Sequence, residues 1–172
     1  EADLILPCSN FIRDELAAKG APVDKMVVHH NTADPARFEP GEKKDLIVFA
    51  GRWTEKKGID TLIAALARLG EELEGWTVRL IGDGDLKEGL VADLEAAGVT
   101  AELPGWVPAD EMPRQWAEAR IAVVPSKRAR SGDAEGLPLV CIEAMLSGCA
   151  LAATRHAGIT ECVRDGETGY LV

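Results

Sequence analysis

The sequence predicts an α/β fold with a doubly wound parallel sheet, and three observations support this prediction. Short apolar runs alternate along the chain with longer segments in which apolar residues recur at helical spacing. The runs at 46–49 and 121–124 are continuously apolar, which is typical of strands that helices cover on both faces. Hydrophobic residues make up 47% and charged residues 28% of the 172 positions, as in ordinary globular domains.

The individual elements follow from the same periodicity. The segments predicted to be strands are Asp3–Pro7, Met26–His29, Asp45–Ala50, Thr77–Ile81, Arg120–Val124 and Cys149–Ala153. The segments predicted to be helices are Asn10–Lys19, 59–69, Leu86–Ala97, Glu111–Ala119 and Pro138–Ser147. The helix after Gly58 is the clearest, because positions 59, 62, 63, 66 and 69 are apolar and define one buried face. Asp110 is expected to cap the fourth helix, with Pro113 in its first turn, where a missing N–H costs nothing.

The chain is predicted to divide near residue 40. The stretch 32–44 contains Pro35, Pro40 and Gly41 and has no sustained period, so it is predicted to be a linker. Residues 1–40 would then be the end of a preceding domain with its linker, and residues 41–172 a ligand-binding domain. The chain begins without Met and stops directly after an apolar run, so we expect it to be a segment of a longer protein.

The overall charge and the cysteines restrict the function classes. A net charge of −10 argues against a nucleic-acid-binding face, which needs clustered basic residues. No apolar run approaches the roughly 18 residues that cross a bilayer. The cysteines form no C-x-x-C pair and lie at no metal-ligand spacing, so they are expected to be buried free thiols in a reducing cytoplasm.

Ligands of an open α/β sheet bind at the carboxyl ends of its strands, and the loop after residue 50 is the first candidate. Gly51 allows a sharp turn directly after the strand, and Arg52 and Lys57 can both reach back over the strand end. Two cations near a helix N-terminus can hold a diphosphate. The alternative from spacing alone is a solvated charged loop.

The second candidate loop is Gly82-Asp83-Gly84-Asp85. A dinucleotide G-x-G-x-x-G would need glycine at 87, where Lys87 stands, so that motif is excluded. The D-x-D pattern could hold a metal diphosphate, but a turn that also caps the next helix explains it equally well. We therefore predict no metal site here.

The third candidate loop, residues 125–137, precedes an apolar helix. Pro138 suits the first helical position, which leaves Glu135 and the free N–H groups of Gly136 and its neighbours facing an anion or an oxygen-rich ligand. Glu143 lies on an otherwise apolar stretch and needs a partner. Sugar hydroxyls or a structural ion pair would serve equally.

Together these segments resemble the retaining GT-B glycosyltransferases known as group 1, or family 4, along nearly the whole chain. The matching segments, in chain order, are Cys8–Phe11, Asn31–Asp34, Gly51-Arg52 with Lys57-Gly58, Leu103–Val107, the E-x7-E element from Glu135 to Glu143, Gly158–Glu161 and Asp165–Gly169. The chain has N-T-A-D where the family usually has N-G-V-D, and Gly148-Cys149-Ala150 where it has G-x-P. The resemblance implies the C-terminal, Rossmann-like, nucleotide-sugar-binding domain of such an enzyme.

The resemblance also implies roles for individual residues. Arg52 and Lys57 would hold the donor diphosphate and stabilise its growing charge, Glu135 would bind hydroxyls of the transferred sugar, and Glu143 the ribose diol. Arg52, Lys57 and Glu135 are thus the expected catalytic residues. The expected donor-binding set is Gly51, Arg52, Lys57, Gly82, Trp106, Val107, Glu135, Gly136, Leu137, Pro138 and Glu143.

The expected activity is hexosyl transfer with retention, without a cofactor or an essential metal, in bacterial surface-polysaccharide synthesis. The partners would be a nucleotide-sugar donor and a separate N-terminal acceptor domain, without which the chain would bind nucleotide but not turn over. A cytoplasmic location is expected, with peripheral contact at the inner face of the membrane as a further option. The rival interpretations are a non-catalytic nucleotide or sugar-phosphate binding module, a GT-B-fold sugar-nucleotide epimerase and a flavodoxin-like regulatory domain.

Overall fold

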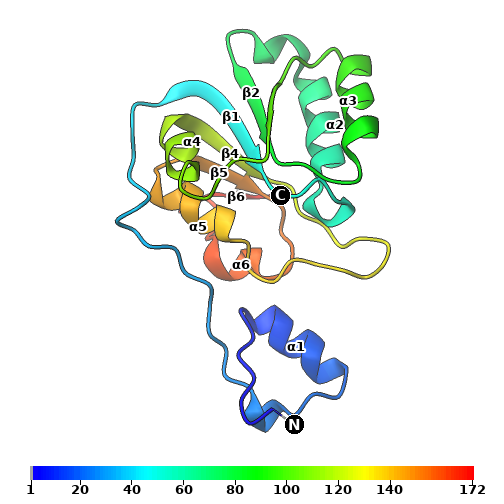
Figure 1. The fold of residues 1–172 in the computed structure, drawn as a ribbon, viewed down its shortest axis with the longest axis vertical. Coiled ribbons are helices and arrows are strands. Elements are labelled where there is room, and N and C mark those ends of the chain that lie inside the picture. Colours follow the sequence, from blue (N-terminus) through cyan, green and yellow to red (C-terminus); the bar gives the residue numbers. More distant parts are fainter. Residues whose placement is uncertain (1) are drawn as a thin grey trace.

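The computed structural model describes residues 2–172 and contains a single parallel β-sheet. The strand order is β3-β2-β1-β4-β5-β6, and all neighbouring strands run parallel (Figure 1). The strands are β1 (Lys44–Ala50), β2 (Thr77–Ile81), β3 (Glu102–Gly105), β4 (Ala119–Val124), β5 (Ala150–Ala153) and β6 (Tyr170–Leu171). The predicted doubly wound α/β fold is therefore confirmed.

Helices cover both faces of this sheet (Figure 1). On one face lie α2 (Ile59–Leu69) and α3 (Lys87–Ala96), and on the other lie α4 (Met112–Glu118), α5 (Leu139–Leu146) and α6 (Ile159–Cys162). Successive residues of β1 enter the two cores in turn: Ile47 packs with α2 and α3, and Val48 packs with α4 and α5. Burial on both faces explains why the strand sequence is continuously apolar rather than alternating.

Residues 2–31 lie outside the sheet, beside its α6 end. They form the helix α1 (Asn10–Ala18) and a short 3₁₀ turn (Val23–Lys25), and an extended linker joins them to β1 (Figure 1). No helix and no strand occurs from residue 27 to residue 43, a range that covers most of the predicted linker 32–44. Among residues 2–172, no helix is long and apolar enough to cross a membrane.

The two strands predicted in the first part of the chain are wrong as strands. Asp3–Pro7 and Met26–His29 meet at one parallel bridge, Ile5 to Met26, and neither forms a regular strand. Leu4, Leu6 and Val27 are more than half exposed, so no second layer covers this pair within residues 2–172. A lone pair of extended segments without a packed face lacks the burial that stabilises a sheet.

Several boundary predictions also need correction. Asp110 does not cap α4: Glu111 is the N-cap residue, and no side chain bonds to the helix start, while Pro113 does lie in the first turn. Pro138 is the N-cap residue of α5 rather than its first helical residue. Strands β3 and β6 and helix α6 were not predicted. β3 is an edge strand that includes Pro104 and exposed positions, so it carries no apolar pattern.

The cysteines match their prediction in part. All four are free thiols, and Cys141 and Cys149 are buried. Cys8 and Cys162 are only half-buried. The interior position of the first two follows from their place in the core between the sheet and α5, where a thiol acts as a small apolar group.

Candidate functional site

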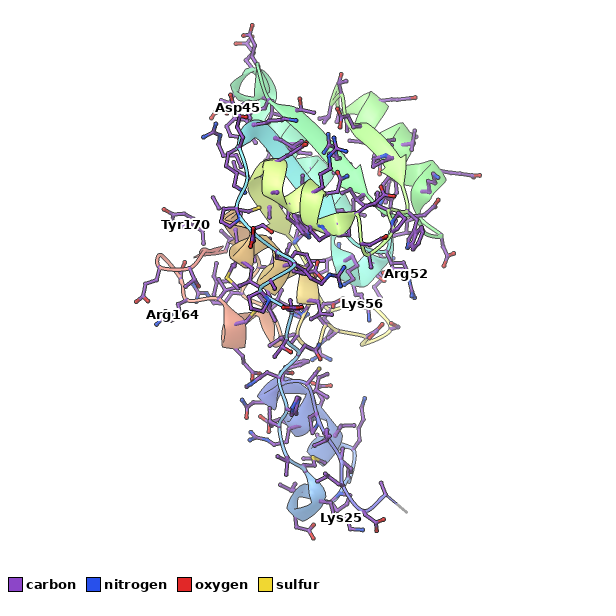
Figure 2. The ribbon with its side chains drawn as sticks, turned by 60° about the vertical axis from the view of Figure 1, so that its left-hand side comes forward. Lys25, Asp45, Arg52, Lys56, Arg164 and Tyr170 are labelled. Atoms are coloured by element: carbon purple, nitrogen blue, oxygen red, sulfur yellow. The ribbon has the colours of Figure 1, made fainter. Side chains whose placement is uncertain are left out.

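The loop after β1 is fastened to the loop after β2 by its backbone. Gly51 N–H donates to the carbonyl of Ile81 at 3.1 Å, and Trp53 N–H donates to that of Asp83 at 2.9 Å. The Trp53 side chain is buried in the core, whereas Arg52 is exposed at the edge of the domain (Figure 2). Within residues 2–172 the Arg52 guanidinium makes no hydrogen bond or ion pair, so its five donors are available to a ligand.

Lys57 lies across the start of this loop and reaches the third loop. Its Cδ atom would be 3.4 Å from a Cβ at Gly51, so the glycine leaves room for the lysine stem. Its Nζ atom is 3.1 Å from Oε1 of Glu135, and the two side chains are 21% and 9% exposed. Among residues 2–172, no donor is aligned with that buried oxygen as a hydrogen bond. The structure thus pairs two predicted site residues by charge and leaves hydrogen-bonding capacity on the carboxylate.

The residues between Glu135 and α5 present backbone donors. Gly136 has no room for a side chain, because a Cβ would lie 2.5 Å from Sγ of Cys8. Leu137 is buried, and its carbonyl accepts a 2.9 Å bond from Asn31 Nδ2. The N–H groups of Gly136 and Leu137 find no acceptor within residues 2–172, so they stay available beside the N-terminus of α5.

A hollow of about 370 Å³ lies at the carboxyl ends of the strands. Its lining comprises Ala50, Gly51, Arg52, Ile81, Gly82, Asp83, Trp106, Val107, Met112, Val140 and Glu143; we call it the strand-end hollow. Gly82 adopts φ = 130°, and a Cβ there would lie 1.9 Å from the Gly51 carbonyl oxygen. Trp106 is 74% exposed. Six predicted donor-binding residues therefore line one hollow, drawn from separate loops and α5.

The other predicted residues form a second group. Lys57, Glu135 and residues 136–138 do not line the strand-end hollow. Arg52 also lines a smaller hollow of about 230 Å³ together with Lys56 and Asp133, and this hollow contains no residue of the second group. Lys56 and Asp133 pair at 3.1 Å and hold the third loop against the first; Figure 2 shows Lys56 on the same side of the molecule as Arg52.

Glu143 has a partner that the sequence did not reveal. Its Oε2 accepts a 3.1 Å hydrogen bond from Nε1 of Trp116, and no ion pair to Glu143 occurs within residues 2–172. Burial raises the pKa of the Glu143 carboxyl, while the Trp116 N–H and the charge of Arg37 act against this rise. The structural ion pair weighed for Glu143 is thus replaced by an indole N–H.

The first aspartate of the D-x-D pattern, Asp83, is held by local hydrogen bonds. Asp83 accepts bonds from Gly84 N–H at 2.8 Å and from Lys87 Nζ at 2.9 Å, and the Lys87 hydrogen bond lowers its pKa. The expected helix cap is wrong, because Leu86 is the N-cap residue of α3 and no side chain caps it. No group of three or more potential metal ligands occurs within the described chain, residues 2–172.

Two residues near the site were missed from the sequence. Glu161 accepts the N–H groups of Asn10 and Phe11 at 2.8 Å each and so caps α1 across the fold. The imidazole of His156 lies 6.3 Å from the Phe11 ring, and burial lowers its pKa. His156 lies in the loop between β5 and α6, and Glu161 lies on α6; only the match of 158–161 to a family segment singled out this region. No local pattern announces a cap that joins residues 150 positions apart.

Comparison with known proteins shows which family this chain belongs to. The sequence pattern of the family described as "Glycosyl transferases group 1" matches residues 44–172, which is most of the chain. The chain belongs to this family. The matched range contains both groups of predicted site residues in the group 1 glycosyltransferase domain.

Curated proteins named as glycosyltransferases match the chain over nearly its whole length. It is 32% identical over 177 residues to WcaL of Escherichia coli K12, a glycosyltransferase named for colanic acid biosynthesis, covering 99% of the chain and 44% of WcaL. It is also 32% identical over 177 residues to an amylovoran biosynthesis glycosyltransferase of Erwinia amylovora, covering 98% of the chain and 43% of that protein. The chain thus spans less than half the length of the curated relatives it matches.

Solved structures of other proteins share the fold. HepE of Anabaena, in complex with UDP and glucose, superposes with a TM-score of 0.86 at 22% identity, over 99% of this chain and 49% of HepE. The C-terminal domain of the group 1 protein LpcC of Francisella tularensis superposes with a TM-score of 0.70 at 27% identity, over 81% of this chain and 79% of that chain. The latter protein has been crystallised as an isolated C-terminal domain.

Proposed function

We propose that this chain is the donor-binding part of a retaining glycosyltransferase of the family 4 type and binds a nucleotide-diphospho-sugar. The observation that carries the proposal is the strand-end hollow, which gathers Gly51, Arg52, Gly82, Trp106 and Glu143 from separate parts of the sequence. HepE, which shares the fold, binds UDP and glucose. A hollow at the carboxyl ends of a parallel sheet is the usual place for a nucleotide.

In this proposal the nucleoside occupies the strand-end hollow and the diphosphate lies at Arg52. The Glu143 carboxylate accepts hydrogen bonds from the ribose diol, and Trp106 and Val107 border the base. The unpaired guanidinium of Arg52 and the ammonium of Lys57 face the diphosphate, which gains negative charge as the glycosidic bond breaks. These two cations are already in place before the reaction, so no groups need to reorient as the charge grows, and the activation barrier is lower.

The transferred sugar would lie on the other side of Arg52, against Glu135. The carboxylate of Glu135 is held by Lys57 and keeps an oxygen without an aligned donor, which suits a sugar hydroxyl. The free N–H groups of Gly136 and Leu137 can bind a sugar or phosphate oxygen at the same place. Attack on the donor-sugar face that the diphosphate leaves would give retention, and the arrangement uses no metal.

The acceptor site would be contributed by a separate N-terminal domain, of which residues 1–40 form the end and the linker. WcaL is more than twice as long as the stretch matched by this chain, which leaves length for such a domain. The chain alone should bind donor without transferring sugar. We place the whole protein in the cytoplasm, at the inner face of the membrane, acting on a surface polysaccharide.

Calorimetric titration of the chain with UDP, GDP and ADP, with and without magnesium, tests this proposal. One nucleotide should bind independently of metal, and Arg52→Ala and Glu143→Ala should each weaken it at least about tenfold, the value of one charge-assisted hydrogen bond. Arg68→Ala is the matched control, since Arg68 is exposed in the last turn of α2. Absence of binding up to about a millimolar, or equal binding by all variants, would contradict the proposal.

A further inference from the structure

Trp116 contacts Glu143, a half-buried residue of the strand-end hollow. Trp116 is completely buried on α4, and its indole N–H donates to Oε2 of Glu143 on α5 at 3.1 Å. An indole N–H can only donate, and a buried donor without an acceptor is unfavourable. The two side chains therefore satisfy each other, and Glu143 at the same time lines the hollow.

The indole is fixed at both its ring and its backbone. The ring lies in the core between the sheet and α5. The carbonyl of Trp116 accepts bonds from Lys43 Nζ at 3.1 Å and from Cys149 Sγ at 3.2 Å. The donor that Glu143 meets is thus rigid, since neither the main chain nor the ring can shift without breaking core contacts.

Glu143 itself has little else to orient it. The terminal torsion of a glutamate is broad, and no cation pairs with this carboxylate within residues 2–172. A vicinal diol is bound well only when the plane of the carboxylate is presented to both hydroxyls. With Oε2 engaged by Trp116, one lone pair of Oε2 and all of Oε1 remain for a ligand.

We propose that Trp116 is a positioning residue, whose indole N–H orients Glu143 in the strand-end hollow and so sets the preference of the hollow for a ribose diol over a 2′-deoxyribose. This inference rests on the proposed function, because it takes the ligand to be a nucleoside diphosphate. Trp116 touches no ligand and acts only through Glu143. A site built to bind a hydroxyl discriminates strongly against a ligand that lacks it.

The test compares UDP, GDP and ADP with their 2′-deoxy forms by calorimetry on the chain and on Trp116→Phe, Glu143→Ala and Trp76→Phe. Trp116→Phe should lower the affinity for the nucleotide that binds about tenfold and leave the affinity for its 2′-deoxy form almost unchanged. The ratio of the two affinities should therefore fall toward the ratio measured for Glu143→Ala. Trp76→Phe removes the same N–H from the opposite core and should leave the ratio intact. A purely structural defect would weaken both nucleotides equally and overturn the inference.

A measurement on the unsubstituted chain covers the case in which Trp116→Phe does not fold. The indole N–H resonance of Trp116 should move as Glu143 titrates and again when nucleotide is added, and its pH-dependent movement should be absent in Glu143→Gln. An indole resonance that stays constant in both titrations would overturn the inference. If the chain binds nucleotide and needs Glu143 but not Trp116, the inference alone fails; if it binds no nucleotide, the proposed function fails with it.

Discussion

The cap that Glu161 places on α1 leads to a quantitative prediction for stability. Burial would raise the pKa of this carboxyl, but the N–H groups of Asn10 and Phe11 and the side chain of His30 outweigh it and bring the pKa to about 2, from an ordinary value of 4.5. Each pKa unit corresponds to about 1.4 kcal/mol, so Glu161 contributes at most about 3 kcal/mol to the free energy of unfolding. Since the side chain is 17% exposed, we expect about 2 kcal/mol after solvent screening.

The direction of the pH dependence follows from the lowered pKa. A carboxyl whose pKa is lower in the folded state stabilises the fold above its ordinary value of 4.5, and this contribution is lost as the pH falls toward about 2. Glu161→Gln should therefore reduce the free energy of unfolding by about 2 kcal/mol at pH 7, and the difference from the unsubstituted chain should shrink steadily below pH 4.5.

Urea unfolding of the two proteins between pH 2 and pH 7 measures this difference, and hydrogen exchange of the α1 amides shows whether the loss is centred on that helix. Glu167→Gln is the control, because its carboxylate is 66% exposed and, within residues 2–172, forms an ion pair only with Arg164, across 3.3 Å. It should have no measurable effect. Equal stability of Glu161→Gln and the unsubstituted chain at pH 7, or a difference that does not change down to pH 2, would refute the reasoning.

Two further substitutions test the close contacts around the site. Gly158→Ala would place a Cβ 1.8 Å from the carbonyl oxygen of Gly136, so we expect thermal unfolding to show a loss of at least about 2 kcal/mol in the free energy of unfolding. Gly89→Ala on α3 is the control, because its Cβ would meet open space and should stabilise the fold by up to about 1 kcal/mol. Similar melting temperatures of the two variants would contradict the contact between the loops that contain Gly136 and Gly158. Lys57→Met leaves the buried Glu135 carboxylate without its cation and should lower the free energy of unfolding by about 2 kcal/mol at pH 7. Adding Glu135→Gln to this variant should restore most of that loss, because it removes the unpaired charge. A double variant that is no more stable than Lys57→Met would argue against the ion pair.

The sheet domain was largely predictable because its pattern is local. The run Leu46–Phe49 is continuously apolar, and the helix after Gly58 has apolar residues at a fixed spacing, and both elements occur at or within a residue of the expected bounds. The strand predictions failed where the sequence pattern does not match how the segment packs in the fold. Asp3–Pro7 has the composition of a strand but meets only one bridge partner, whereas β3 pairs along the sheet edge despite Pro104.

The candidate site was predictable to the extent that topology constrains it. Once the strands are parallel, their carboxyl ends lie at one edge, so Arg52, Gly82 and Glu143 were expected to meet there and do line one hollow. Their roles as ligands of a nucleotide sugar stay predictions. The separation of Glu135 from this hollow was not predicted, because it depends on how the loop ahead of α5 packs.

The sequence by itself determined the order of elements, the parallel sheet and the loops that carry chemistry, because these depend on the spacing of apolar residues, glycines and charges along the chain. Only the tertiary structure decided which side chains from distant parts of the chain meet. These contacts are Lys57 with Glu135, Trp116 with Glu143, and Glu161 with the start of α1. A hydrogen bond or ion pair needs two groups within about 3 Å, and no local pattern encodes such proximity between distant residues. That proximity arises when the sheet and its helices pack.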